Sequence, residues 1–112
     1  MARTHEEVDR RSLALHAEVA ARLRAQPSLL RIARENLERW RRRREDGDPA
    51  ASAIQEWQEI LDTLSLDDLC DLLMEQSERG DRLRQSSPFA GILTPAQVWE
   101  IKRSFTGEKT RA

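Results

Sequence analysis

Few side chains in this sequence have the types and spacing that catalysis or metal binding requires. His5 and His16 have no Cys or His companion at the spacing of a metal site. Ser86 and Ser87 have no base beside them in the sequence, so we interpret them as turn formers rather than nucleophiles. Cys70 is the only cysteine, which excludes an internal disulfide and fits a reducing compartment.

The densest group of reactive side chains is acidic. Between residues 45 and 81 the sequence has twelve acidic residues and a single arginine, Arg79. Neighbouring carboxylates can transfer protons or bind cations, but the stretch has no Asp-x-Asp-x-Asp-Gly calcium loop. A Gly-rich phosphate loop, a Gly-x-Ser-x-Gly motif and a Cys–His pair are also missing. The sequence therefore favours a binding or regulatory module over an enzyme, without a cofactor, a metal or a small-molecule substrate.

Length and composition predict one all-α domain. The chain has 112 residues, of which 38% are hydrophobic and 35% charged, and this length suits one domain. β-branched residues are sparse and tyrosine is absent, which argues against a sheet. No run approaches the roughly 20 apolar residues of a membrane span, and residues 1–11 lack the apolar segment of a signal peptide. We therefore expect a cytoplasmic protein without membrane contact.

The charges are unevenly distributed along the chain. Residues 1–44 contain twelve arginines and six acidic residues, whereas residues 45–112 contain seven basic and fourteen acidic residues. The net charge of the whole chain is only −1. This asymmetry predicts either that the two halves dock on each other or that each has a charged partner of its own.

Apolar residues recur at helical spacing in five or six segments. The predicted helices cover residues 5–25, 27–45, 49–64, a stretch from Ser65, a segment from Ser77 or Glu78 to Gln85, and residues 95–106. The short Gln26-Pro27 break favours an N-terminal helical hairpin over residues 5–45. The linker Asp46–Pro49 would join it to a small C-terminal helical bundle over residues 49–106, followed by a frayed tail at 107–112. The expected core residues are Ile54, Trp57, Leu61, Leu69, Leu73 and Val98.

Capping residues mark the starts of three of these helices. Asp48 followed by Pro49 suits one helix start, and Ser65 suits the next. Thr94-Pro95-Ala96-Gln97 combines a capping threonine, a proline in the first helical position and a glutamine that completes a capping box. The last motif is the strongest local signal in the chain.

A basic run ends the second predicted helix. Cations near a helix C-terminus complement the helix dipole, which explains part of the run without any function. Arginines grouped around Trp40 also suit contact with phosphates. The candidate nucleic-acid-binding residues are Arg39, Arg41, Arg42, Arg43 and Arg44. They leave open a transcriptional regulator with operator DNA as its partner, although we can place no helix-turn-helix.

The segment between residues 82 and 95 is the main candidate for binding another protein. Loops are usually polar, yet this one is apolar at Phe89, Ala90, Ile92 and Leu93. Either the loop folds back to close the core, or it presents an apolar surface to a partner. On the second interpretation, Phe89 and Arg84 are the leading anchors, because aromatic and arginine side chains tend to dominate interface energies. The full set of candidate partner-binding residues is Arg82, Leu83, Arg84, Gln85, Ser86, Pro88, Phe89, Ile92, Leu93 and Trp99.

The same segment carries a family resemblance. Residues 79–95, which read RGDRLRQSSPFAGILTP, resemble the C-terminal signature of a family of short bacterial proteins. The stretch from Leu13 to His16 and the Glu56-Trp57 pair look similar too. These proteins are associated with operons that also encode a nucleotidyltransferase-like protein. This arrangement resembles the antitoxin half of toxin–antitoxin pairs of the MenA/MenT kind.

The resemblance implies a function and a partner. It implies an antitoxin-like protein that binds and neutralises a cognate nucleotidyltransferase toxin acting on tRNA, by contact that blocks its active site. It implies no catalytic residue in this chain. A site that binds tRNA is expected to be electropositive. An acidic stretch could therefore dock there, and its members are Glu56, Glu59, Asp62, Asp67, Asp68, Asp71 and Glu75.

Overall fold

The protein is all-α, as the sequence predicts. The computed structural model describes residues 5–45 and 47–110, with side chains for residues 10–45 and 47–104. These residues form six α-helices, one short 3-10 helix (η1) and no strand: α1 (His5–Ala25), η1 (Pro27–Leu29), α2 (Leu30–Arg43), α3 (Pro49–Thr63), α4 (Leu66–Leu73), α5 (Glu78–Gln85) and α6 (Pro95–Thr110). Among the described helices, none is long and apolar enough to cross a bilayer.

The predicted caps hold three of the helix starts. The Asp48 carboxylate accepts a hydrogen bond from the Ala50 backbone N–H at 2.8 Å and opens α3. Ser65 opens α4, because its hydroxyl accepts from a backbone N–H three residues on, at 3.1 Å. At α6 the capping box is reciprocal: Thr94 Oγ1 accepts from the Gln97 N–H at 3.1 Å, and Gln97 Oε1 accepts from the Thr94 N–H at 2.8 Å. These local bonds satisfy backbone groups that a helix start leaves without partners.

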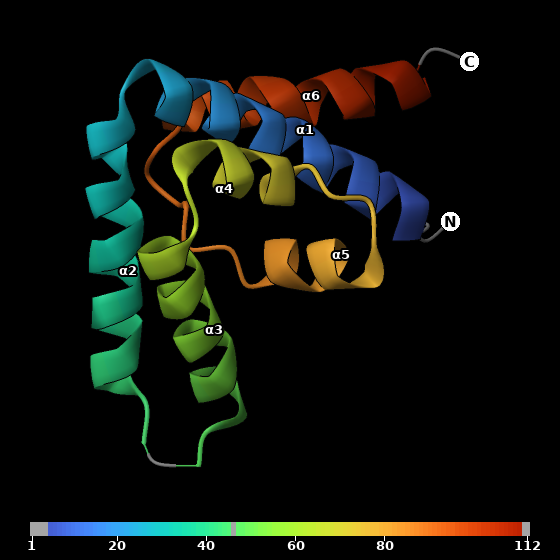
Figure 1. Cartoon of the computed structure of the whole chain (residues 1–112). Coiled ribbons are helices and arrows are strands. Elements are labelled where there is room, and N and C mark those ends of the chain that lie inside the picture. The colour runs from blue at the N-terminus through green and yellow to red at the C-terminus, as the bar shows by residue number, and fades with distance from the viewer. Residues whose placement is uncertain (1–4, 46, 111–112) are drawn as a thin grey trace.

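The helical hairpin of the fold is α2 with α3, and this corrects the expectation of a hairpin over residues 5–45. After η1 the chain turns sharply away from α1 into α2, and α3 returns beside α2 (Figure 1). Arg34 on α2 bridges the pair, because its guanidinium bonds both the Asp62 carboxylate at 2.6 Å and the Leu61 carbonyl at 2.8 Å on α3. Pro27 starts a 3-10 turn that redirects the chain instead of folding it back.

Helix α1 is the centre of the other half of the molecule. Helix α6 packs along one side of α1, and α4 and α5 lie on the other (Figure 1). Helix α6 continues to Thr110, so the predicted tail is wrong for residues 107–110. Gly107 alone costs a helix only about 1 kcal/mol relative to Ala, and no proline follows it. Residues 111–112 lie outside the described part of the chain.

The core joins both halves. Ile54, Trp57, Leu61, Leu69 and Leu73 are buried as predicted. Val98 is only half-buried and packs against the core from α6. Helices α1 and α2 add the buried side chains Val19, Ala20, Leu23, Ala33 and Leu37.

Candidate functional site

The apolar loop after α5 closes the core of its own chain. Pro88, Phe89, Ile92 and Leu93 are all buried. The Phe89 side chain is 4% exposed. Its ring meets the Trp57 ring edge to face, with centroids 5.3 Å apart and planes at 87°. In this structure the loop presents no apolar anchor at Phe89, so the expectation that Phe89 fills a pocket of a partner is corrected.

Asn36 on α2 donates the hydrogen bonds that the backbone of this buried loop needs. A loop without regular hydrogen bonding has carbonyl groups that need partners once water is excluded. The buried Asn36 amide donates to the Pro88 carbonyl at 2.8 Å and to the Ala90 carbonyl at 2.9 Å. Its carbonyl oxygen accepts from Arg39. Gly91, with a φ of 97°, makes the turn that follows.

Ser87 has a base beside it, although none is near it in the sequence. His16 on α1 lies with Nε2 2.9 Å from the Ser87 hydroxyl, and its Nδ1 is 2.7 Å from the Ser12 carbonyl. Because a carbonyl only accepts, Nδ1 carries the proton, and Nε2 accepts from the Ser87 hydroxyl. This pairing corrects the interpretation of Ser87 as a residue without a neighbouring base.

The His16 ring is buried, and its surroundings favour the neutral form. Burial lowers its pKa, opposed by the hydrogen bond to the Ser12 carbonyl, and the positive charge of Arg84 lowers it further. The ring also packs edge-on against Phe89, with centroids 6.3 Å apart. With 6% of its surface exposed, His16 joins α1 to the loop, and we assign it no catalytic role.

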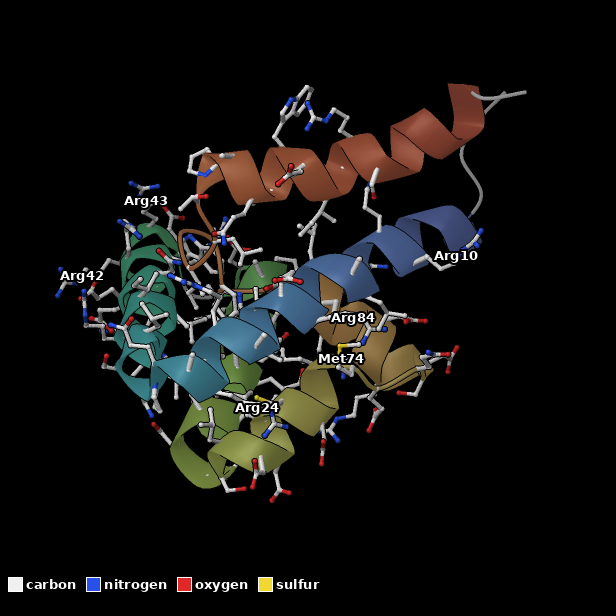
Figure 2. The ribbon with its side chains drawn as sticks, turned by 90° about the horizontal axis from the view of Figure 1, so that it is seen from above. Arg10, Arg24, Arg42, Arg43, Met74 and Arg84 are labelled. Carbon is white, nitrogen blue, oxygen red and sulfur yellow. The ribbon has the colours of Figure 1, made fainter. Side chains whose placement is uncertain are left out.

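Arg84 is buried and bonded to groups of its own chain. It is 5% exposed, and its guanidinium donates to the Leu73 carbonyl at 3.2 Å and to the Glu75 carbonyl at 2.7 Å. It also pairs with Asp81. Figure 2 shows it beside Met74, where α4 ends. Arg84 thus caps the C-terminal end of α4, and its expected role as an interface anchor is corrected.

The remaining candidate partner-binding residues are divided between the two sides of α1. Leu83 is buried, and Ser86 accepts a hydrogen bond from the Trp57 indole at 3.2 Å. Arg82 is exposed but pairs with Glu56, and Gln85 is exposed. In both figures α1 lies between α5 and α6. Trp99, 64% exposed on α6, is therefore separated from the exposed residues of α5.

Ion pairs between helices neutralise part of the charge that is unevenly distributed along the sequence. Arg24 pairs with Asp67 at 2.6 Å, Arg34 with Asp62 at 2.6 Å, and Arg82 with Glu56 at 2.6 Å. The last pair lowers the pKa of the Glu56 carboxyl, chiefly through the hydrogen bond from Arg82. Two of the three join the arginine-rich half to the acidic half, so internal docking is confirmed in part. The other four members of the acidic stretch make no ion pair with the described residues: Glu59, Asp68, Asp71 and Glu75.

The arginine run projects from the far end of α2. Its five arginines are exposed, and Figure 2 shows Arg42 and Arg43 reaching outward from that end. Arg41 and Arg42 share Glu38, with N–O distances of 2.6 and 3.2 Å, and Arg44 lies 3.6 Å from Asp48. Arg43 makes no ion pair with the described residues. The run is therefore only partly neutralised.

One hollow runs along α2, and two more lie at its C-terminal end. One of about 620 Å³ is lined by Arg34, Glu35, Glu38, Arg39, Arg42 and Arg43. A second of about 210 Å³ is lined by Trp40, Arg44, Ala50, Ala53, Ile54 and residues 85–87. A third of about 480 Å³ includes Arg41, Arg44, Gln55 and Gln58. Arginine and glutamine lining suits anions and hydrogen-bonding ligands.

The described side chains contain no group of three or more His, Cys, Asp or Glu residues that could hold a metal ion. Comparisons with protein-family models, with curated proteins and with solved structures gave no match for this chain.

Proposed function

We propose that this protein acts by protein–protein contact, as an antitoxin-like inhibitor that uses helix α6 as its contact surface. Its partner is the nucleotidyltransferase-type toxin acting on tRNA that the family resemblance implies. The inhibitor blocks the toxin's active site and takes no part in catalysis. The observation that carries the proposal is the exposure of Trp99.

Trp99 has the properties of an interface anchor. A tryptophan side chain can bury 150–250 Å², roughly, when it enters a partner's pocket. Helix α6 packs toward α1 and the core with its half-buried Val98 and Ile101, which leaves Trp99 at 64% exposure. Glu100 and Arg103 beside it are exposed and charged. A central aromatic with a charged rim is the usual composition of a binding hot spot.

The acidic helices supply the electrostatic part of the proposal. Glu59 on α3 and Asp68 and Asp71 on α4 are exposed and make no ion pair with the described residues. A site that holds tRNA needs positive charge to bind phosphates. Unpaired carboxylates would steer this protein toward the positive field around such a site, because charge attraction acts over distances longer than direct contact.

Co-purification tests the proposal. A tagged copy is expressed with the product of the adjacent gene, which the proposal expects to be nucleotidyltransferase-like, and the amount of captured partner is measured. We expect Trp99→Ala to weaken binding about 30-fold or more, which corresponds to a hot spot of at least about 2 kcal/mol.

The matched control for this experiment is Met74→Ala. Met74, at the end of α4, is the other large hydrophobic side chain that is exposed in the described part of the chain, at 39%. We expect this variant to capture the partner as the parent does. Equal capture by Trp99→Ala and the parent would rule out α6 as the contact surface.

A further inference from the structure

We propose a second binding site, independent of the α6 surface: the two adjoining hollows at the end of α2 bind single-stranded nucleic acid. One base would stack on Trp40, and the phosphate that follows would contact Arg44. The ligand class is defined by these two contacts, an aromatic face for a base and a guanidinium for a phosphate.

The Trp40 hollow has the size and walls of a base-binding pocket. Its volume of about 210 Å³ is several times the roughly 30 Å³ that one water occupies in the liquid, so a planar ring can enter. Trp40 is half-buried and packs against the core, which holds the indole in place before a ligand arrives. Ala50, Ala53 and Ile54 provide the other apolar walls.

Gln85 is the polar group in this hollow that is free to contact a base edge. The Ser86 hydroxyl is engaged by Trp57 and by the Leu83 carbonyl, and the Ser87 hydroxyl by His16. Gln85 is exposed, and its side-chain amide makes no hydrogen bond with the described residues. Its amide has two donors and an acceptor, so it can pair with the edge of any base.

Arg44 lies between the two hollows, where a phosphate would have to pass. It lines both the Trp40 hollow and the one of about 480 Å³ beside it. Its pair with Asp48 is 3.6 Å long, beyond direct hydrogen-bond distance, so the guanidinium is available to a second anion. The larger hollow adds Arg41, with Glu45 as its acidic member.

Charge favours a single strand as the occupant. The five exposed arginines at this end of α2 provide the positive field that tracks a phosphate backbone. A base in the Trp40 hollow must be unstacked and unpaired, which a single strand allows without the cost of opening a duplex. Duplex DNA would contact the arginines but leave the hollow empty.

Fluorescence anisotropy with a labelled single-stranded DNA of about ten nucleotides tests the site, because single strands occupy roughly 4–16 nucleotides on such surfaces. The full-length protein is titrated at low and moderate salt, and the duplex of the same sequence is titrated in parallel. We expect the single strand to bind more tightly than the duplex. Trp40→Ala should weaken binding about 10-fold, within the range that loss of one base–aromatic stack produces.

Arg44→Gln and Arg31→Gln form a matched pair of variants. Each variant removes one exposed arginine, on α2 or at its end, and each arginine makes one ion pair with an N–O distance of 3.6 Å. Arg31, however, lines none of the three hollows. We expect Arg44→Gln to weaken binding and to reduce the salt slope by about 1, and Arg31→Gln to have a smaller effect. Circular dichroism melts of each variant separate lost binding from lost folding, and Gln85→Ala provides an exposed variant should Trp40→Ala unfold.

Three results would overturn the proposal. One is an equal loss of affinity in the two arginine variants, which would mean general charge attraction only. Another is equal or tighter binding of the duplex, which would favour a duplex-binding surface. The third is no binding of the single strand at low salt.

Discussion

Replacing Phe89 with alanine will destabilise this protein. Phe89 is 4% exposed and its ring packs edge to face on Trp57 and against His16, with centroids 5.3 and 6.3 Å away. Truncation of a buried phenylalanine costs about 3–5 kcal/mol, because the apolar transfer energy is lost and a cavity remains. Two aromatic neighbours place the expected loss toward the upper half of that range, since each such pair adds roughly 0.5–1.5 kcal/mol.

A thermal melt followed by circular dichroism measures this loss. For a chain of this length, 1 kcal/mol corresponds to about 4 °C in melting temperature. We therefore expect Phe89→Ala to lower the melting temperature by about 15–20 °C, a large part of the total stability of about 5–15 kcal/mol that is typical of a domain.

Trp99→Ala is the control for Phe89→Ala, because it also removes an aromatic ring but from an exposed position. Its melting temperature should stay within about 2 °C of the parent, as for most surface substitutions. A Phe89→Ala protein that melts with the parent would refute the placement of this side chain in the core. It would return the loop to the list of interface candidates.

Three further predictions follow from single contacts. Gly80→Ala should destabilise the protein by about 1–3 kcal/mol in a denaturant titration, because an added Cβ would lie 2.1 Å from the Glu75 carbonyl oxygen. Ala is otherwise the better helix former, so a more stable variant would contradict this contact. Asn36→Ala should cost about 2–4 kcal/mol, because it leaves the buried Pro88 carbonyl and the partly buried Ala90 carbonyl without this donor. A cost below about 1 kcal/mol would count against the network. The melting temperature should fall as the pH drops below about 6.5, because burial lowers the pKa of His16 in the folded protein and only the unfolded chain takes up the proton there; His16→Gln should flatten this dependence.

The helix starts could be predicted from the sequence because their capping signals are local. Asp48, Ser65 and the Thr94–Gln97 pair each act over two or three residues, so the pattern contains the whole interaction. Trp57 was predictable as core for the same reason, since it lies on a regular apolar stripe of its helix.

The arrangement of the helices and the state of the loop depend on contacts between distant residues. Asn36 reaches the Pro88 carbonyl from 52 positions away, and His16 reaches Ser87 from 71 positions away. Asn36 is a polar residue beside the apolar residues of α2, and this was the available signal in the sequence. The sequence does not show which carbonyls its amide would bond. The sequence likewise shows that Arg84 is charged, but only the position of α4 in the fold shows which carbonyls its guanidinium caps.

The most direct measurement of the proposed function is inhibition of the partner. The nucleotidyltransferase-type toxin that the proposal names as the partner is assayed for transfer of a labelled nucleotide to tRNA while this protein is added. We expect equimolar parent protein to suppress the transfer and folded Trp99→Ala to leave most of it intact. Transfer that continues undiminished with excess parent protein, or that Trp99→Ala suppresses as well as the parent does, would contradict inhibition through helix α6.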